Sequence, residues 1–425
     1  MADRRLGKSG VGVPGPAADG SPVMILALEM FRSVPRMVAA KAVGGRIPGI
    51  LSGPAAPLRL VSREQPAASR PGWARVRVRL SGICGSDLGA LSGRTSLYFS
   101  GLVSMPFVPG HEVVGDLMDD CDDLPSGTRV VLDSVLTCAA RGVEPCASCS
   151  AGATNRCDRI TVGHLAPGLQ TGFCADTGGG WSQVFIAHRS QLHAVPDDLT
   201  DEQAVLVEPL ACAVHTALRA RVNRGDHVLV SGAGSVGLLT TLALRELTPA
   251  GDITVVAKHA HQRDLARDFG ATDVVVPDEA LRGVRRSTRA FHVRGQLGRS
   301  YLLGGVDIAI DAVGSRKSVE QALHATKAGG RVVLSGMPAV ADLSAAWFRE
   351  LEVIGSYASA SREPAADGRG SFDLAMELAA GGGVADVASG VVSYPLHRWR
   401  EALDHAHSAG RLGAVKVTFD PRSSR

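Results

Sequence analysis

The sequence predicts a two-domain α/β protein in which an irregular, mostly β domain is joined to a domain built on a doubly wound parallel sheet. Three observations lead to this prediction. The chain has 425 residues, which is too long for one ordinary core and fits two domains. Short β-like runs broken by Gly and Pro continue to about residue 193. After residue 226, apolar runs of strand length alternate with helical patterns, as in a parallel sheet covered on both faces.

The first 36 residues are rich in Gly, Pro and Ala and show no sustained hydrophobic period, so we expect a disordered tail. The apolar patch at 23–30 is short and contains Glu29, which argues against a signal peptide. No apolar run approaches the roughly 20 residues that span a bilayer. A net charge of +3 is small for this length, which argues against nucleic acid or an anionic membrane as a partner. We therefore expect a cytoplasmic protein.

The first part of the mostly β domain is expected to span residues 37–200. Residues 74–80 alternate strictly between apolar and polar side chains, which predicts a half-buried strand. Gly and Pro then separate short apolar runs, which indicates long loops. At about Asp201 a helical pattern begins and continues through Leu218.

The parallel-sheet domain is expected to span residues 201–355, after which the chain returns to the first domain over 356–425. The Arg-rich segment 282–299 is expected to be a solvated excursion. Strands are expected at 227–231, 253–256, 274–276, 306–311, 331–335 and 414–419, and helices at 235–247, 263–269, 319–326 and 399–407.

A glycine motif follows the strand expected at 227–231 and begins a helix, and this context makes it credible as a nucleotide-binding loop. Gly232 permits the tight turn, Gly234 lets the backbone approach a pyrophosphate, and Gly237 allows close packing of helix on strand. Ser235 and Val236 begin the helix, whose free N–H groups and positive dipole end suit phosphate. The motif predicts a dinucleotide cofactor; a plain Gly-rich turn is the alternative.

The residues after the second expected strand bear on which cofactor binds. NAD-binding domains of this kind place an Asp or Glu there to hold the ribose 2′-hydroxyl. Here Lys258 stands at that point, and Arg263 follows at the start of the next helix. Because cationic side chains pair with a 2′-phosphate, we expect NADP(H) in preference to NAD(H). The alternative is that Lys258 is only solvated and that NAD binds without its acidic partner.

A second group of residues has the side chains of an open metal site. The motif G-I-C-G-S-D contains Cys84 and Ser86, P-G-H-E contains His111 and Glu112, and Glu208 comes later in the chain. Thiolate, imidazole and carboxylate ligands together suit Zn²⁺. Taken singly, each has a structural explanation, because a free cysteine is usually a buried thiol and Glu208 could only be favouring a helix dipole.

These motifs resemble those of the zinc-dependent medium-chain dehydrogenases, most closely the sorbitol, threonine and glucose dehydrogenase branch. The resemblance covers about residues 37–419 and also includes G-G-W-S at 179–182, V-E-P-L-A-C-A-V-H at 207–215 and the nucleotide loop. It implies a GroES-like catalytic domain with a Rossmann domain. It also implies NAD(P)-linked oxidation of a secondary alcohol, such as a polyol, sugar or amino alcohol, or the reverse carbonyl reduction.

Two other functions remain open at this point: a zinc-free NADPH-dependent reductase and a catalytically silent nucleotide-binding protein, both on the same fold. The retained metal-ligand types oppose the first of these. For the dehydrogenase we expect a small-molecule alcohol or carbonyl substrate and a homodimer or homotetramer.

The resemblance implies roles for the metal-site residues. Cys84 and His111 would be zinc ligands, and Glu112 and Glu208 would complete the set, one directly and the other through water; which is which stays open. Zn²⁺ would polarise the substrate alcohol. Ser86 stands where the family keeps a hydroxyl that relays the alcohol proton.

Further roles follow from the same resemblance. Asp87 looks like the carboxylate that orients His111. The substrate pocket is expected to draw on residues 97–99 and on His164. Cys212, one helical turn after Glu208, is expected to belong to the core.

Four of the eight cysteines fall within twenty residues. Clustered cysteines in a long chain without a secretory signal indicate metal ligands before disulfides. Cys146, Cys149 and Cys157 match the last three ligands of the family's structural zinc lobe. Val143 stands where the first cysteine would fall, so a longer loop would have to bring Cys138 round as the fourth ligand of a Cys₄ tetrahedron. The alternative is a three-cysteine relic without metal.

Overall fold

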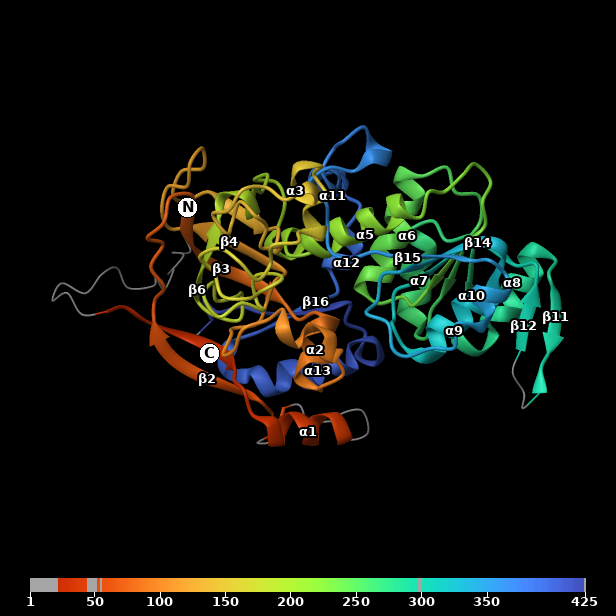
Figure 1. Ribbon diagram of the computed structural model, residues 1–425, viewed down its shortest axis with the longest axis horizontal. Helices are drawn as coiled ribbons and strands as arrows, with labels where there is room; N and C mark the ends of the chain where they lie inside the picture. Colours follow the sequence, from red (N-terminus) through yellow and green to blue (C-terminus); the bar gives the residue numbers. More distant parts are fainter. Residues whose placement is uncertain (1–21, 44–51, 54–55, 297–299, 424–425) are drawn as a thin grey trace, which may run out of the picture.

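The computed structural model describes residues 22–43, 52–53, 56–296 and 300–423, and its two large sheets lie side by side along the molecule (Figure 1). The first sheet has the strand order β16-β17-β3-β4-β5-β7, with β6 added to β3. Its strands are β3 (Trp73–Gly82), β4 (Val113–Leu117), β5 (Arg129–Leu132), β6 (Val184–His188), β7 (Leu192–Ala194), β16 (Val391–Tyr394) and β17 (Lys416–Phe419).

Strand β3 explains why this sheet has one buried face. Along the strand, the apolar side chains are buried and the intervening arginines point outward, half-exposed. Strands β4 and β6 pair antiparallel with β3 on either side for part of its length. The alternation expected at 74–80 is therefore confirmed as the central strand of the sheet.

The second sheet is parallel throughout, with the order β10-β9-β8-β13-β14-β15. The order reverses between β8 and β13, which is the point where open α/β sheets bind ligands. Its strands are β8 (Val228–Ser231), β9 (Ile253–Val256), β10 (Asp273–Val275), β13 (Val306–Asp311), β14 (Thr326–Leu334) and β15 (Glu352–Gly355), and its helices are α6 (Ser235–Leu247), α7 (Ala260–Asp268), α8 (Ala280–Thr288), α9 (Arg316–Ala325) and α10 (Ser344–Phe348).

The prediction that residues 1–36 form a disordered tail is wrong for the segment that follows residue 21. Strand β1 (Met24–Met30) pairs antiparallel with β2 (Leu58–Glu64), and Ala27 and Leu28 are fully buried. Helix α1 (Val34–Val43) follows. The composition could not show this, because the strand is stabilised by a partner more than twenty-five residues away. Residues 1–21 lie outside the described part of the chain.

The helix expected from Asp201 to Leu218 is interrupted. It forms as α4 (Asp201–Ala204) and α5 (Val207–Arg219), with a turn between them. Pro209 accounts for the break, since it has no N–H to donate to Val205 and its ring would clash with that carbonyl, whereas proline is tolerated in the first turn of a new helix. Helix α5 is buried on nearly every side.

The Arg-rich segment is also more ordered than expected. Helix α8 covers its first part, and β11 (Phe291–Arg294) follows, paired antiparallel with β12 (Ser300–Leu303) just beyond the segment. Residues 297–299 lie outside the description. The hairpin forms the far end of the parallel-sheet domain (Figure 1).

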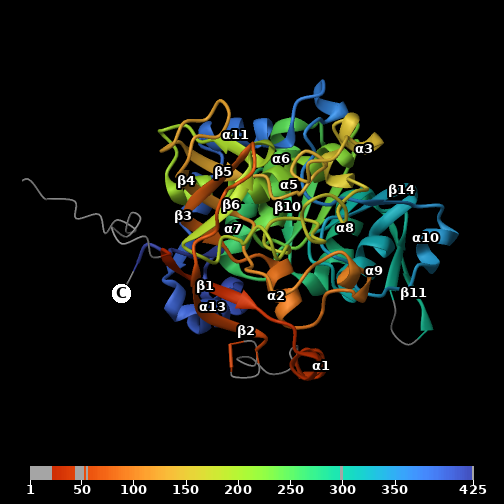
Figure 2. The same ribbon diagram turned by 60° about the vertical axis from the view of Figure 1, so that its left-hand side comes forward.

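After β15 the chain returns to the first sheet. Helix α13 (Trp399–Leu412) packs against β17, which pairs parallel to β16 and antiparallel to β3. Figure 2 shows α13 beside β1 and β2. The remaining helical segments are α2 (Gly85–Leu91), α3 (Ala147–Ser150), α11 (Ser371–Ala380), α12 (Ala385–Ala388), η1 (Leu97–Gly101), η2 (Thr154–Arg156), η3 (Arg189–Gln191), η4 (Pro277–Glu279), η6 (Pro364–Ala366) and η7 (Leu396–Arg398). Among the described residues, no helix has the length and apolar character that crossing a membrane requires.

Candidate functional site

Three predicted metal ligands meet where β3 ends and β4 begins. Cys84, His111 and Glu112 each offer a ligand atom, and these atoms lie within 4.8 Å of one another. The sheet explains the meeting: Ser81 of β3 pairs with Val113 of β4, so the residues just after one strand lie beside those just before the other. The backbone N–H of Gly82 donates to the carbonyl of Glu112 at 2.8 Å, which fixes the two segments together.

Gly82 is needed for this approach. A Cβ at this position would lie 1.9 Å from Glu112 Oε2, closer than any real contact. The absence of a side chain at Gly82 therefore lets the Glu112 carboxylate lie against the end of β3.

Asp87 holds the other two members of the cluster. Its Oδ2 accepts a hydrogen bond from the backbone N–H of Cys84 at 2.9 Å, and its Oδ1 lies 3.5 Å from His111 Nδ1. Burial opposes protonation of His111, but the charges of Asp87 and Cys84 outweigh it and hold the pKa of His111 well above its ordinary value. The hydroxyl of Ser86 lies 3.4 Å from His111 Nε2, the ring atom that Asp87 leaves free.

Glu112 is buried with a lysine that sequence reasoning missed. Lys416 Nζ donates to Glu112 Oε1 at 2.6 Å, from the closing strand β17. Burial lowers the pKa of Lys416, but the charges of Glu112 and Cys84 raise it by more than burial lowers it. The net pKa lies above its ordinary value, so the lysine stays charged. The signal available in the sequence was the charge of Lys416 within the mostly apolar strand expected at 414–419.

The environment of the second oxygen of the Glu112 carboxylate indicates whether a metal fits this site. Glu112 Oε2 is buried and has no hydrogen-bond partner among the described groups. Leaving a buried charged group unsatisfied is costly, and a cation bound beside Cys84 and His111 would satisfy it. The donor set of sulfur, nitrogen and oxygen also suits Zn²⁺. The residues present therefore fit the metal.

Glu208 lies close by, in the first turn of α5, but outside the three-residue cluster. Burial raises the pKa of Glu208 to about 7, with the charge of Glu112 adding to the effect and that of His111 opposing it. Cys212, expected in the core, is only half-buried, and its thiol donates to Glu208 Oε1 at 3.5 Å.

The nucleotide loop has the backbone that its three glycines predict. Gly232 has a φ of +101°, a conformation that other residues rarely adopt, and a Cβ there would meet Val313 at 2.4 Å. A Cβ at Gly237 would lie 1.9 Å from the carbonyl of Gly232, so helix α6 packs directly on the turn. A Cβ at Gly234 would meet nothing within 4 Å, which leaves the loop open for a ligand.

The loop and the metal-ligand cluster share one cavity of about 260 Å³. Cys84 and Gly85 line it on one side, and Gly234 lines it on the other, at the start of α6. Also lining it are Ser235, Val236, His261 and Lys416.

Lys258 is exposed directly after β9 and Ala257. The guanidinium of Arg263 donates to the Lys258 carbonyl at 3.1 Å, which places the two cationic residues at the same end of the strand. No acidic residue stands between the end of β9 and the start of α7.

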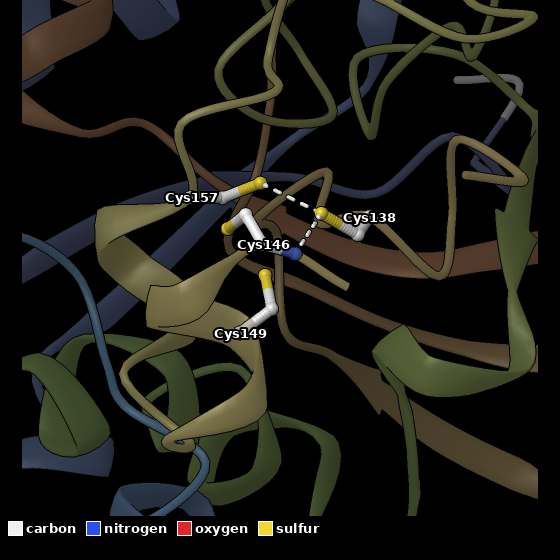
Figure 3. Close-up of side chains that lie close together, drawn as sticks. All are labelled: Cys138, Cys146, Cys149 and Cys157. Atoms are coloured by element: carbon white, nitrogen blue, oxygen red, sulfur yellow. Dashed lines mark hydrogen bonds between the residues drawn. The ribbon is translucent and has the colours of Figure 1, made fainter. Parts of the chain in front are cut away.

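The four clustered cysteines meet in a separate lobe (Figure 3). Their sulfur atoms lie within 4.8 Å of one another, and Cys138 Sγ is 3.6 Å from Cys157 Sγ. The N–H of Cys146, at the start of α3, donates to Cys138 Sγ at 3.3 Å. Hydrogen bonds from the backbone of Asp158 and Cys149 lower the pKa of Cys146 to about 6. The longer loop therefore brings Cys138 to the other three, and all four are free thiols.

The expected substrate-pocket residues do not line the cavity that Cys84 and Gly234 share. His164 lies in a second cavity, lined also by Trp73 and His188. Leu97 and Tyr98 are exposed on η1.

Tyr357, which the sequence did not single out, lies near Glu208. Its hydroxyl donates to Gln170 Oε1 at 3.1 Å. Burial of the hydroxyl raises the pKa of Tyr357, and the charges of Cys212, Glu208 and Asp133 add to this effect. The residue as a whole is 43% exposed. The side chain therefore lies near Glu208 and Cys212 and is partly open to a ligand.

Comparison with known proteins adds two domain matches and a set of relatives. The alcohol dehydrogenase GroES-like domain matches residues 70–197, and the zinc-binding dehydrogenase domain matches residues 235–381. The chain is 29% identical to L-idonate 5-dehydrogenase of Vitis vinifera, over 67% of this chain and 72% of the relative. It is also 29% identical to D-xylulose reductase A of Aspergillus niger, over 79% of this chain and 87% of the relative.

Two solved structures have the same fold. A zinc-binding dehydrogenase of Sinorhizobium meliloti, bound to NADP, matches with a TM-score of 0.65 and 24% identity, over 94% of this chain and 99% of that one. The 2R,3R-butanediol dehydrogenase of Bacillus subtilis matches with a TM-score of 0.65 and 22% identity, over 94% and 99%. Both likenesses establish the two-domain architecture predicted from the sequence.

Proposed function

Because the chain belongs to the zinc-type medium-chain alcohol dehydrogenases, as its motifs predicted, we propose that it interconverts a secondary alcohol and its ketone. Hydride would pass between the carbinol carbon and a nicotinamide cofactor. The observation that supports this most directly is the shared cavity: Cys84 of the metal-ligand cluster and Gly234 of the nucleotide loop line the same space. The two halves of an alcohol oxidation would therefore meet there.

Cys84, His111 and Glu112 would hold the catalytic Zn²⁺. When bound, Zn²⁺ supplies a Lewis acid that makes an alcohol hydroxyl easier to deprotonate. We assign direct ligation to Glu112 because its carboxylate belongs to the cluster, and because its Oε2 is buried and without a hydrogen-bond partner among the described groups. Glu208 would act from farther away, since it lies outside the cluster that Cys84, His111 and Glu112 form.

Ser86 would receive the proton that the alcohol loses. Its hydroxyl lies 3.4 Å from His111 Nε2, at the first turn of α2, so it reaches the ligand cluster without joining it. A hydroxyl in this place can accept the proton of the alcohol as it gives its own to solvent, because Ser86 is only half-buried.

The four-cysteine lobe would hold a second, structural Zn²⁺. Four thiol groups within 4.8 Å, with three of the cysteines buried, suit a closed tetrahedral site with no open position for substrate. Thiolate ligation requires reduced cysteines, so we propose a cytoplasmic location.

A polyhydroxylated substrate fits the polar side chains around Glu208. Tyr357 and Gln170 are joined by a hydrogen bond, and Asp133 lies near Tyr357. Burial raises the pKa of Asp133 to about 7, so its carboxyl can donate as well as accept near neutral pH. Hydroxyl groups on a polyol would pair with these side chains, whereas an apolar alcohol would leave them unsatisfied. The relatives named for idonate and xylulose act on such compounds.

For the cofactor we propose NADP(H) in preference to NAD(H). The end of β9 has Lys258 and Arg263 and no acidic residue, so a 2′-phosphate would meet cations. Comparing kcat/KM for the two cofactors tests this. A clear preference for NAD that is unchanged in Lys258→Ala would contradict it.

A homodimer is the oligomer we propose. Strand β15 is the edge of the parallel sheet, and Val353 on it is partly exposed. Trp347 and Phe348 of α10 lie just before it and are 83% and 70% exposed. An open strand edge beside apolar side chains favours pairing with a second copy.

The experiment for the function is a screen of polyols, sugars and amino alcohols with both cofactors, with zinc content measured on the same sample. Turnover of secondary alcohols by zinc-loaded protein is the expected result. Turnover by zinc-free protein would favour the zinc-free reductase. Cofactor binding without turnover of any of these compounds would favour the catalytically silent protein.

A further inference from the structure

Arg141 is a buried cation without an acidic ion-pair partner in the described part of the chain. It lies in the turn between Cys138 and Cys146, and none of its surface is exposed. A charged side chain in the interior is rare unless an opposite charge lies near it. The position of Arg141 in the extra length between two clustered cysteines therefore needs an explanation.

The guanidinium is held entirely by backbone carbonyl groups. Nε donates to Leu136, before the first cysteine, and Nη2 donates to Gly168 at 2.5 Å, beyond the last one. Nη1 donates to Val162 and Leu165 at 3.1 and 3.2 Å, with longer contacts to Ala166. These bonds join the chain that precedes the lobe to the loop that follows it. They satisfy the donors of Arg141 but leave its charge uncompensated.

Four groups that can carry a negative charge act on Arg141, and two of them are cysteines of the lobe. Cys138 and Cys157 act on Arg141, as do Cys174 and the carboxylate of Asp176. A Zn²⁺ ion bound by four thiolates has a net charge of two minus. Cys138, Cys146 and Cys157 are buried, so little water could screen that charge.

We propose that Arg141 is the counter-charge of the four-cysteine site, and that it allows a doubly negative zinc centre to be buried in this lobe. The inference rests on the structural zinc proposed above. It explains why Cys138 lies farther from Cys146 than the first cysteine of the family's zinc lobe would. The turn that carries Arg141 occupies this extra length. Gly163 makes room for it: a Cβ there would lie 2.4 Å from the Arg141 carbonyl and 2.9 Å from its Cβ.

Two substitutions separate the charge from the hydrogen bonds. Arg141→Gln keeps two of the five N–H donors but removes the charge, whereas Arg141→Lys keeps the charge but loses the planar fork. In the full-length, zinc-loaded protein, we expect R141Q to release one zinc to a chelator roughly 10–100-fold faster than wild type, the usual cost of losing a residue that supports a metal's ligands. We expect R141K to release zinc more slowly than R141Q. Arg156→Met, which alters an exposed arginine of the same lobe, is the control and should match wild type.

A second measurement removes the ambiguity of a poorly folding variant. Thermal unfolding of R141Q and wild type is compared with zinc and after chelation. A counter-charge predicts that R141Q loses more stability relative to wild type with zinc than it does after chelation, because the lost hydrogen bonds weigh equally in both states. Equal destabilisation in both states, or slower zinc release from R141Q than from R141K, would overturn the inference.

Zinc content of the wild type separates this inference from its premise. If the cysteine lobe of the wild type binds no zinc, the structural site itself is wrong. If it binds zinc and R141Q retains zinc as wild type does, only the counter-charge is wrong.

Discussion

Lys416 and Glu112, 304 residues apart in the chain, form a buried ion pair with 2.6 Å between Nζ and Oε1 and with 3% and 1% of their side chains exposed. The pair joins the closing strand β17 to the start of β4. It holds Glu112 Oε1, while Oε2 has no hydrogen-bond partner among the described groups and the carboxylate lies in the cluster with Cys84 and His111. Lys416 therefore positions the carboxylate that we assign to the metal.

Replacing Lys416 with Met should be strongly destabilising, because Glu112 would be left charged and unpaired in the interior. The expected loss is about 3–5 kcal/mol in the free energy of unfolding, measured with denaturant. Lys327→Met is the control, since Lys327 forms its ion pair with Asp307 near the surface and should cost about 1 kcal/mol or less. Similar losses in the two variants would contradict the role given to Lys416.

Replacing Ser86 with Ala should lower kcat without releasing zinc. The hydroxyl is assigned to proton transfer, whose removal typically costs roughly 10²–10⁴-fold in rate. Ser100→Ala, which alters an exposed hydroxyl of η1, should leave kcat unchanged. Turnover and zinc content are measured across pH, and full turnover of Ser86→Ala at every pH would show that another group takes the proton.

Replacing Tyr357 with Phe should change substrate preference more than turnover. Loss of one hydrogen bond to a substrate hydroxyl would lower kcat/KM for polyols about tenfold, and a simple secondary alcohol should react as before. Tyr98→Phe serves as the control because Tyr98 is exposed on η1. An equal effect of Tyr357→Phe on both kinds of alcohol would argue against a polar substrate wall.

Asp133 should make the protein less stable as the pH rises. Its pKa is about 7 in the folded state and near 4 in the unfolded state, so the folded protein binds the proton more tightly. Between pH 6 and 8 the folded Asp133 ionises, which should lower the stability of wild type by about 1.4 kcal/mol relative to Asp133→Asn. Denaturant unfolding of both proteins at the two pH values measures this. A difference between them that does not change with pH would mean that the folded Asp133 does not ionise between pH 6 and 8.

The parallel-sheet domain could be predicted from the sequence because its signals are local. The strands at 253–256 and 306–311 are short apolar runs, and the loop from Gly232 to Gly237 follows directly from a strand. Strand β1 was missed because its stability depends on pairing with β2, which composition does not reveal. The hairpin of β11 and β12 was missed because arginines obscure its pattern.

Part of the candidate site could be predicted from the sequence, because the signals for that part are also local. Cys84, His111 and Glu112 stand in two short motifs, and their meeting follows from the pairing of β3 with β4. Lys416 could not be found in this way, since nothing near it in the sequence points to Glu112. Tyr357 likewise reaches the site only because the chain returns from one domain to the other.

The central claim is that zinc bound by Cys84, His111 and Glu112 is required for hydride transfer. The most direct test measures zinc per chain and alcohol-dependent reduction of the cofactor in the wild type and in Cys84→Ser. We expect two zinc ions and turnover in the wild type, and one zinc ion, a folded protein and no turnover in the variant. Turnover by Cys84→Ser with one zinc ion, or by wild type stripped of zinc, would contradict the account.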